Sequence, residues 1–90
     1  MTRNVLPEDI FALAERVVAA NKAAGRMIVT AESCTGGLVA AALTEVPGSS
    51  AVLQSGFVTY SNEAKIKTLK VGEELIDTFG AVSVAVAWAM

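Results

Sequence analysis

The amino-acid sequence predicts an α/β fold in which helices flank a sheet in an α/β/α arrangement. Two β-branched or aromatic runs, residues 27–29 and 52–60, alternate with segments of helical periodicity. The first run leads through small polar residues and two glycines into an alanine-rich segment, which is the order of a strand, a turn and a helix. A strand, a helix and a second strand favour a right-handed crossover between parallel strands. The functional site of such a sheet is expected beyond the carboxyl ends of its strands.

The first helix is predicted over residues 8–24, after a loose terminus at residues 1–6. Pro7 and the acidic residues behind it suit a first turn, where proline loses no hydrogen bond and carboxylates face the positive end of the helix dipole. Gly25 supplies a left-handed stop. Apolar residues spaced by three and four share one face, which we expect to be core: Ile10, Leu13, Ala14, Val17 and Val18.

The rest of the chain is organised around residues 30–37, Thr-Ala-Glu-Ser-Cys-Thr-Gly-Gly. Such a turn can direct the backbone N–H groups of Thr35, Gly36 and Gly37 outward at the start of the next helix, where they and the helix dipole favour negative charge. Ser33 stands at its rim. The turn suits either a bound anion or the oxyanion that forms when a serine attacks a carbonyl group.

The second helix is predicted from Thr35 to Thr44, before a Pro-Gly turn at residues 47–48. Ser49 and Ser50 follow as loop or cap residues. Gly56, inside the strand over residues 52–60, indicates a bulge or a close approach of two backbones.

Ser61 or Asn62 is expected to cap the next helix. Lys65 and Lys67 do not share a face of that helix, so one can point toward a pocket while the other meets solvent. A short helix over residues 73–79 is expected to end at Gly80. Ser83 then looks like the cap of a last helix over residues 84–90.

The composition is strongly apolar for a small domain: 53% of the 90 residues are hydrophobic, 18% are charged and the mean hydropathy is +0.53. The last helix breaks off within two turns. We therefore expect a single domain over residues 1–90, truncated after residue 90, that forms a homo-oligomer or belongs to a larger unit. The apolar runs are too short for a membrane span, no export signal is visible, and the single cysteine fits a reducing compartment. These features favour a cytoplasmic protein.

The charge pattern excludes several classes of function. A net charge of −2 and a sequence pI near 4.9 argue against nucleic-acid binding, and the cluster of Lys65, Lys67 and Lys70 is more simply a solvated face. Without histidine or a cluster of cysteines, a metal site has almost no support.

A serine needs a base to become a nucleophile. Because the chain has no histidine, a Ser-His-Asp triad within it is excluded and a Ser-Lys pair remains. Lys65 lies about one helical turn beyond Tyr60, near the end of the second strand. A lysine buried there could accept the proton of Ser33, whereas the alternative is an ordinary solvated lysine.

Three neighbours of these residues have two interpretations each. Cys34 is either a rival nucleophile or, more simply, a small packing residue. Glu32 is either a hydrogen-bond partner of the substrate or a surface carboxylate. Tyr60 is either a proton relay or an aromatic residue that closes a strand.

Four ordered blocks of the sequence resemble a known family, and the resemblance covers residues 8–90. The blocks are Ala-Glu-Ser-Cys-Thr-Gly-Gly at 31–37, Pro-Gly-Ser-Ser at 47–50, Gly-Phe-Val-Thr-Tyr-Ser-Asn-Glu-Ala-Lys at 56–65, and Gly-Ala-Val-Ser at 80–83. Together they resemble the C-terminal domain family of the competence/damage-inducible protein CinA, a nicotinamide-nucleotide amidohydrolase family that converts nicotinamide mononucleotide to nicotinic acid mononucleotide and ammonia.

The resemblance implies that Ser33 is the nucleophile, Lys65 the base and Tyr60 the group that assists proton transfer to the departing ammonia. It implies an oxyanion site at the turn and no metal or cofactor. The residues expected at the substrate are Glu32, Thr35, Gly36, Gly37 and Ser50.

The sequence departs from the family in one respect. Members of the family continue well past the equivalent of Met90, through a glycine-rich loop that completes the nucleotide pocket. Two other functions therefore stay open, a non-catalytic nucleotide- or phosphate-binding module and an inactive half-domain that associates through an apolar face.

Overall fold

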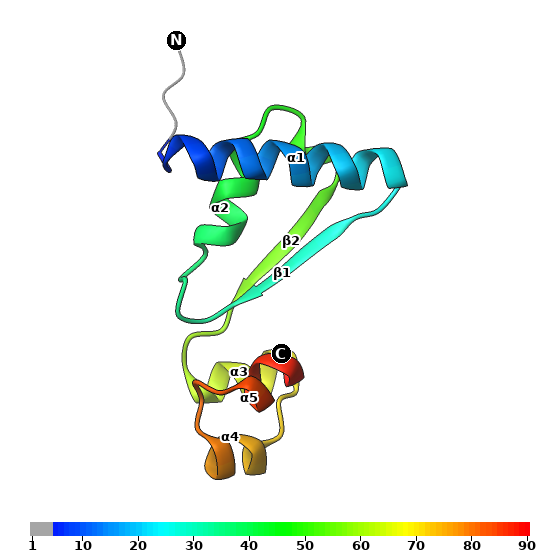
Figure 1. The fold of residues 1–90 in the computed structure, drawn as a ribbon. Helices are drawn as coiled ribbons and strands as arrows, with labels where there is room; N and C mark the ends of the chain where they lie inside the picture. The colour runs from blue at the N-terminus through cyan, green and yellow to red at the C-terminus, as the bar shows by residue number, and fades with distance from the viewer. Residues whose placement is uncertain (1–4) are drawn as a thin grey trace. The chain divides into compact units, whose positions relative to one another are not determined.

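The computed structural model describes residues 5–90, and these form five α-helices, one 3₁₀ helix and two β-strands (Figure 1). The chain divides into two compact units. The first comprises the chain up to Thr30 together with Gly37–Phe57, and the second comprises Ala31–Gly36 together with Val58–Met90. Each strand runs from the first unit into the second.

The strands are β1 (Ile28–Glu32) and β2 (Leu53–Val58), which pair in parallel as a two-stranded sheet. In the first unit the N–H of Ile28 donates to the main-chain oxygen of Val52 at 2.6 Å. The helices of this unit are α1 (Glu8–Ala24), α2 (Leu38–Thr44) and the 3₁₀ helix η1 (Ser49–Ala51). The predicted α/β class is confirmed.

Helix α1 has the predicted bounds. Pro7 precedes its first residue, and Gly25 ends it with φ 67° and ψ 32°, the left-handed conformation that glycine adopts without strain. The predicted apolar face is only half buried, however. Ile10 is 40% exposed and Leu13 54% exposed, so the expectation that the whole stripe is core is wrong.

The buried part of that stripe belongs to the core of the first unit. Partly buried residues of α1, α2 and both strands pack around this core, which keeps the two helices against the sheet. Its buried members are Ala14, Val18, Leu43, Val46 and Val52.

Gly56 in β2 is a point of close approach, as the sequence predicted. A Cβ atom at this position would lie 2.7 Å from Thr30 Oγ1 of β1 and 3.3 Å from the Cβ of Ala40 in α2. Only glycine lets the strand and the helix come this close.

Helix α2 and both strands differ from their predicted bounds. Helix α2 begins at Leu38 and not at Thr35, because Gly36 and Gly37 have φ angles of 61° and 101° and extend the turn. The first strand is longer than residues 27–29 and excludes Met27, and the second is shorter than residues 52–60.

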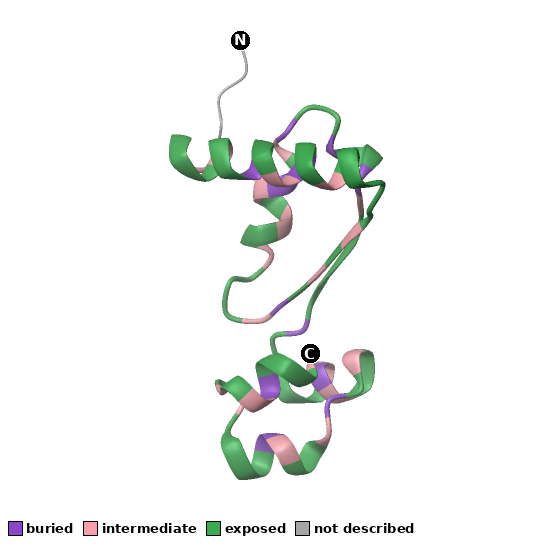
Figure 2. Ribbon diagram, turned by 45° about the vertical axis from the view of Figure 1, so that its right-hand side comes forward, coloured by how far each residue is buried: buried purple, intermediate pink, exposed green. Residues whose placement is uncertain are grey.

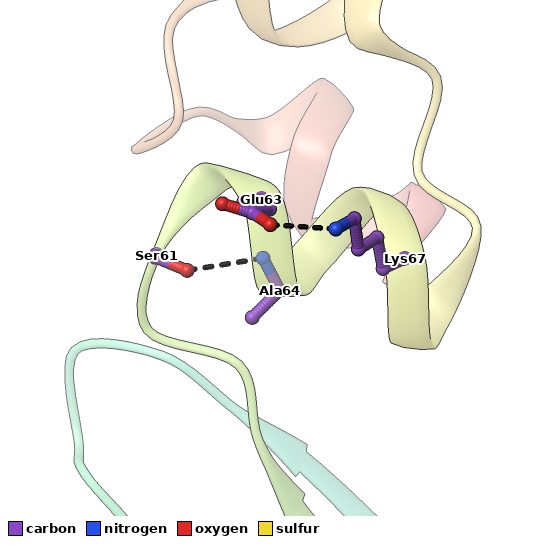
Figure 3. Close-up of polar contacts among 4 residues, drawn as sticks. All are labelled: Ser61, Glu63, Ala64 and Lys67. Carbon is purple, nitrogen blue, oxygen red and sulfur yellow. Dashed lines mark hydrogen bonds and ion pairs between the residues drawn. The ribbon is translucent and has the colours of Figure 1, made fainter.

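The second unit contains three short helices, α3 (Asn62–Leu69), α4 (Glu73–Phe79) and α5 (Val84–Ala89). The predicted caps are confirmed: Ser61 Oγ accepts a hydrogen bond from the N–H of Ala64 at 3.0 Å (Figure 3), and Ser83 Oγ accepts one from the N–H of Val86 at 3.2 Å. A small core holds the helices together. It is made of Val71, Ile76 of α4 and Val86 of α5, with partly buried apolar neighbours that include Ile66 and Leu69 of α3. Figure 2 shows how few positions of each helix are buried.

Candidate active site

The predicted catalytic turn lies in the second unit and is anchored by Glu32. This carboxylate, at the end of β1, is only 5% exposed, and its Oε1 accepts a hydrogen bond from Thr35 Oγ1 at 2.6 Å. The interpretation of Glu32 as a surface carboxylate is therefore wrong. The bond closes residues 32–35 into a loop that carries the half-buried Ser33.

The main chain of the turn is also engaged. The N–H of Gly36 donates to the main-chain oxygen of Ser33 at 3.0 Å. This N–H was expected to face an oxyanion, and in the structure it stabilises the turn instead. The side chain of Cys34 is exposed, so its interpretation as a packing residue is wrong.

Lys65 is the most deeply buried charged residue of the described chain. It lies in the first turn of α3, is 2% exposed, and its Nζ donates to the main-chain oxygen of Tyr60 at 2.8 Å. Lys67 shows the contrast, because its side chain is 73% exposed and pairs with Glu63 at 2.7 Å on the surface of α3 (Figure 3). The prediction that the two lysines differ in their surroundings is confirmed, and the solvated interpretation of Lys65 is wrong.

Thr59 is a buried polar residue that the sequence reasoning missed. It is 2% exposed, its N–H donates to the main-chain oxygen of Glu32 at 2.8 Å, and its Oγ1 makes no hydrogen bond within residues 5–90. The signal lay in the two-residue period of an extended chain, which places Thr59 inward between the exposed Val58 and Tyr60. Tyr60 itself is 73% exposed.

These contacts connect the two predicted catalytic segments through a short path. Ser33 follows Glu32, whose main-chain oxygen accepts the N–H of Thr59. Tyr60 follows Thr59 and accepts the Nζ donor of Lys65. Two hydrogen bonds thus connect the serine turn and helix α3 to residues 59–60, which follow the end of β2. All of these residues belong to the second unit.

The remaining predicted binding residues, Gly37 and Ser50, belong to the first unit. Gly37 is the residue before α2, and Ser50 lies exposed in η1 beside the buried Ser49. Within residues 5–90 no three His, Cys, Asp or Glu side chains gather in a way that could hold a metal ion. None of the helices described has both the length and the apolar character that a membrane crossing requires.

The family of the chain follows from comparison with known proteins. The model of the CinA C-terminal domain family matches residues 10–90. The chain belongs to this family. The resemblance seen in the four sequence blocks is therefore confirmed.

Relatives of this CinA-family chain include a nicotinamide-nucleotide amidohydrolase PncC of Escherichia coli, 52% identical over 83% of the chain and 46% of that protein. A CinA-like protein of Chloroherpeton thalassium is 61% identical over 77% of the chain and 16% of that protein. The crystal structure of the competence/damage inducible protein CihA from Agrobacterium tumefaciens superposes on the chain with a TM-score of 0.94 at 53% identity. The match covers 100% of this chain and 53% of the A. tumefaciens chain. The chain thus spans about half of these proteins or less. The roles of the site residues and the homo-oligomer stay predictions.

Proposed function

We propose that the chain contributes the catalytic serine and lysine of a nicotinamide-nucleotide amidohydrolase, which hydrolyses the carboxamide of nicotinamide mononucleotide to the carboxylate and ammonia. The proposal is supported by the 52% identity to the E. coli enzyme that carries this name. The chain covers 46% of that enzyme, so the identity alone does not assign the whole enzyme's activity to this chain.

The observation that carries the proposal is the burial of Lys65 and its hydrogen bond to Tyr60. Burial and this bond fix the position of the amino group beside the segment that carries Ser33, and a positioned lysine is one of the side chains that can serve as a general base. Most lysines on a short surface helix resemble Lys67, so the burial of Lys65 requires a reason.

The proposed reaction begins when Ser33 Oγ attacks the carboxamide carbon while Lys65 takes the hydroxyl proton. The resulting oxyanion is stabilised by backbone N–H groups of the turn other than that of Gly36, which donates to Ser33, at about 3 kcal/mol for each donor. Lys65, with the help of Tyr60, then passes this proton to the carboxamide nitrogen of the substrate. Ammonia departs, and the acyl group stays bound to Ser33 as an acyl-enzyme. Water then attacks the acyl group, with Lys65 again as base, and releases the carboxylate product.

Ammonia release from nicotinamide mononucleotide tests the proposal, with Ser33→Ala compared against Cys34→Ala. Loss of the nucleophile is expected to lower kcat by about a thousandfold or more, whereas removal of the exposed neighbouring thiol changes it by less than about twofold. Full ammonia release by Ser33→Ala, at the rate of an active unaltered chain, would exclude Ser33 as the nucleophile. Nucleotide binding without any ammonia release would favour the non-catalytic binding module.

A further inference from the structure

An apolar groove lies in the first unit between α1, β1 and α2. It encloses about 490 Å³. Its α-helical walls include Ile10 and Leu13 of α1 and Leu38 and Val39 of α2, and these four side chains are between 40% and 56% exposed. Large apolar side chains that gather in one open groove indicate a surface that another molecule covers.

The lining of the groove narrows the choice of that molecule. Among the lining residues that the structure describes, Thr30 is the only polar one and none is charged. Small-molecule sites combine apolar walls with several convergent polar groups, and a nucleotide needs donors for its phosphates. The groove therefore suits apolar side chains of a polypeptide.

A polypeptide in the groove would also stabilise the two-stranded sheet beside it. The groove takes Ile28 and Thr30 from β1 and no residue from β2, so it lies on the β1 side of the pair. Two-stranded sheets are marginally stable in water and gain stability when a further strand or helix packs on them. An element laid into the groove would cover the exposed side chains of α1 and α2 and support β1.

The solved relatives indicate what this polypeptide is. The A. tumefaciens structure reproduces the whole chain with a TM-score of 0.94, yet the chain covers 53% of it. A second solved relative, from Klebsiella pneumoniae, is likewise covered to 50%. These proteins therefore add roughly an equal length of chain to the same α1, β1 and α2 framework.

We infer that the groove is the docking surface for a polypeptide equivalent to the unmatched half of these relatives. The inference is independent of the amidohydrolase proposal, because it rests on the first unit alone. It holds whether that half is joined to this chain or supplied by another.

Co-production of the 90-residue chain with the unmatched half of the A. tumefaciens protein tests the inference, because neither part then has to fold alone. Light scattering after size-exclusion chromatography is expected to show a one-to-one complex. Leu13→Glu places a carboxylate in the groove and is expected to weaken the complex at least tenfold. Ala12→Glu is the matched control, since Ala12 is an exposed neighbour on α1 that does not line the groove, and we expect a change below about twofold.

Three results would overturn the inference. The first is a folded chain, with helical circular dichroism, that forms no complex. The second is equal weakening by Leu13→Glu and Ala12→Glu. The third is a symmetric dimer of the 90-residue chain that Leu13→Glu dissociates, because the occupant would then be a second copy.

Discussion

Lys65 Nζ donates a 2.8 Å hydrogen bond to the main-chain oxygen of Tyr60, five residues earlier in the chain. The side chain thereby folds back over the N-terminus of its own helix, and the lysine is 2% exposed. A buried amine held by one main-chain oxygen keeps other directions available for chemistry. The geometry distinguishes this lysine from its neighbour Lys67 on the same helix.

The first prediction compares Lys65→Met with Lys67→Met. Methionine keeps an unbranched apolar stem but cannot accept a proton, so Lys65→Met is expected to lower kcat for ammonia release by about a hundredfold or more. Lys67→Met removes only an exposed pair with Glu63, which is worth about 0.3–0.5 kcal/mol in a helix. Its kcat is expected to stay within about twofold of the unaltered value. Similar losses in both variants would contradict a special role for Lys65.

A second prediction concerns the bond from Thr35 Oγ1 to Glu32 Oε1, which is 2.6 Å long. Thr35→Val has nearly the same shape but removes the donor, and a lost hydrogen bond of this kind costs about 0.5–1.5 kcal/mol. We expect kcat/KM to fall about tenfold because the loop that carries Ser33 loosens. Thr35→Ser keeps the hydroxyl group and is expected to retain most of the activity. If the serine variant fails as badly as the valine variant, the methyl group of Thr35 and not its hydroxyl group matters.

The helices were predictable because their ends carry local signals. Gly25 and Gly80 end helices with positive φ angles, and Ser61 and Ser83 start helices through side-chain acceptors. These effects act within a few residues and need no tertiary information. The start of α2 was missed because two left-handed glycines lengthen a turn without changing the apolar pattern.

Burial was predictable only in part. Helical periodicity shows which residues share a face, yet it does not show whether another element covers that face, and Leu13 is exposed for this reason. The difference between Lys65 and Lys67 followed from the same periodicity. The acceptor of Lys65, by contrast, is a main-chain oxygen, which any residue type supplies, so the sequence carries no signal for it.

The last prediction concerns Gly56, where two elements meet most closely. A Cβ at this position would lie 2.7 Å from Thr30 Oγ1, on a short side chain with little freedom to move, and 3.3 Å from Ala40 Cβ. Gly56→Ala is therefore expected to lower the free energy of unfolding by about 1–3 kcal/mol in urea denaturation. Gly72→Ala is the matched control. Its nearest atom would be Glu74 Oε1 at 2.6 Å, at the end of a flexible side chain that can turn away, so the expected loss is only that of a less favourable N-cap of α4, about 0.5–1 kcal/mol.

A double variant separates steric crowding from the loss of glycine itself. Thr30→Ala removes the hydroxyl group that the new methyl group would strike, so Gly56→Ala should cost less in that background, with a coupling energy of at least about 0.5 kcal/mol. Strict additivity of the two changes would show that the clash with Thr30 does not decide the effect. Because Thr30 also lines the groove between α1, β1 and α2, the same pair of residues sets how closely β1 and β2 lie against α2, and hence the width of the surface offered to a docking polypeptide.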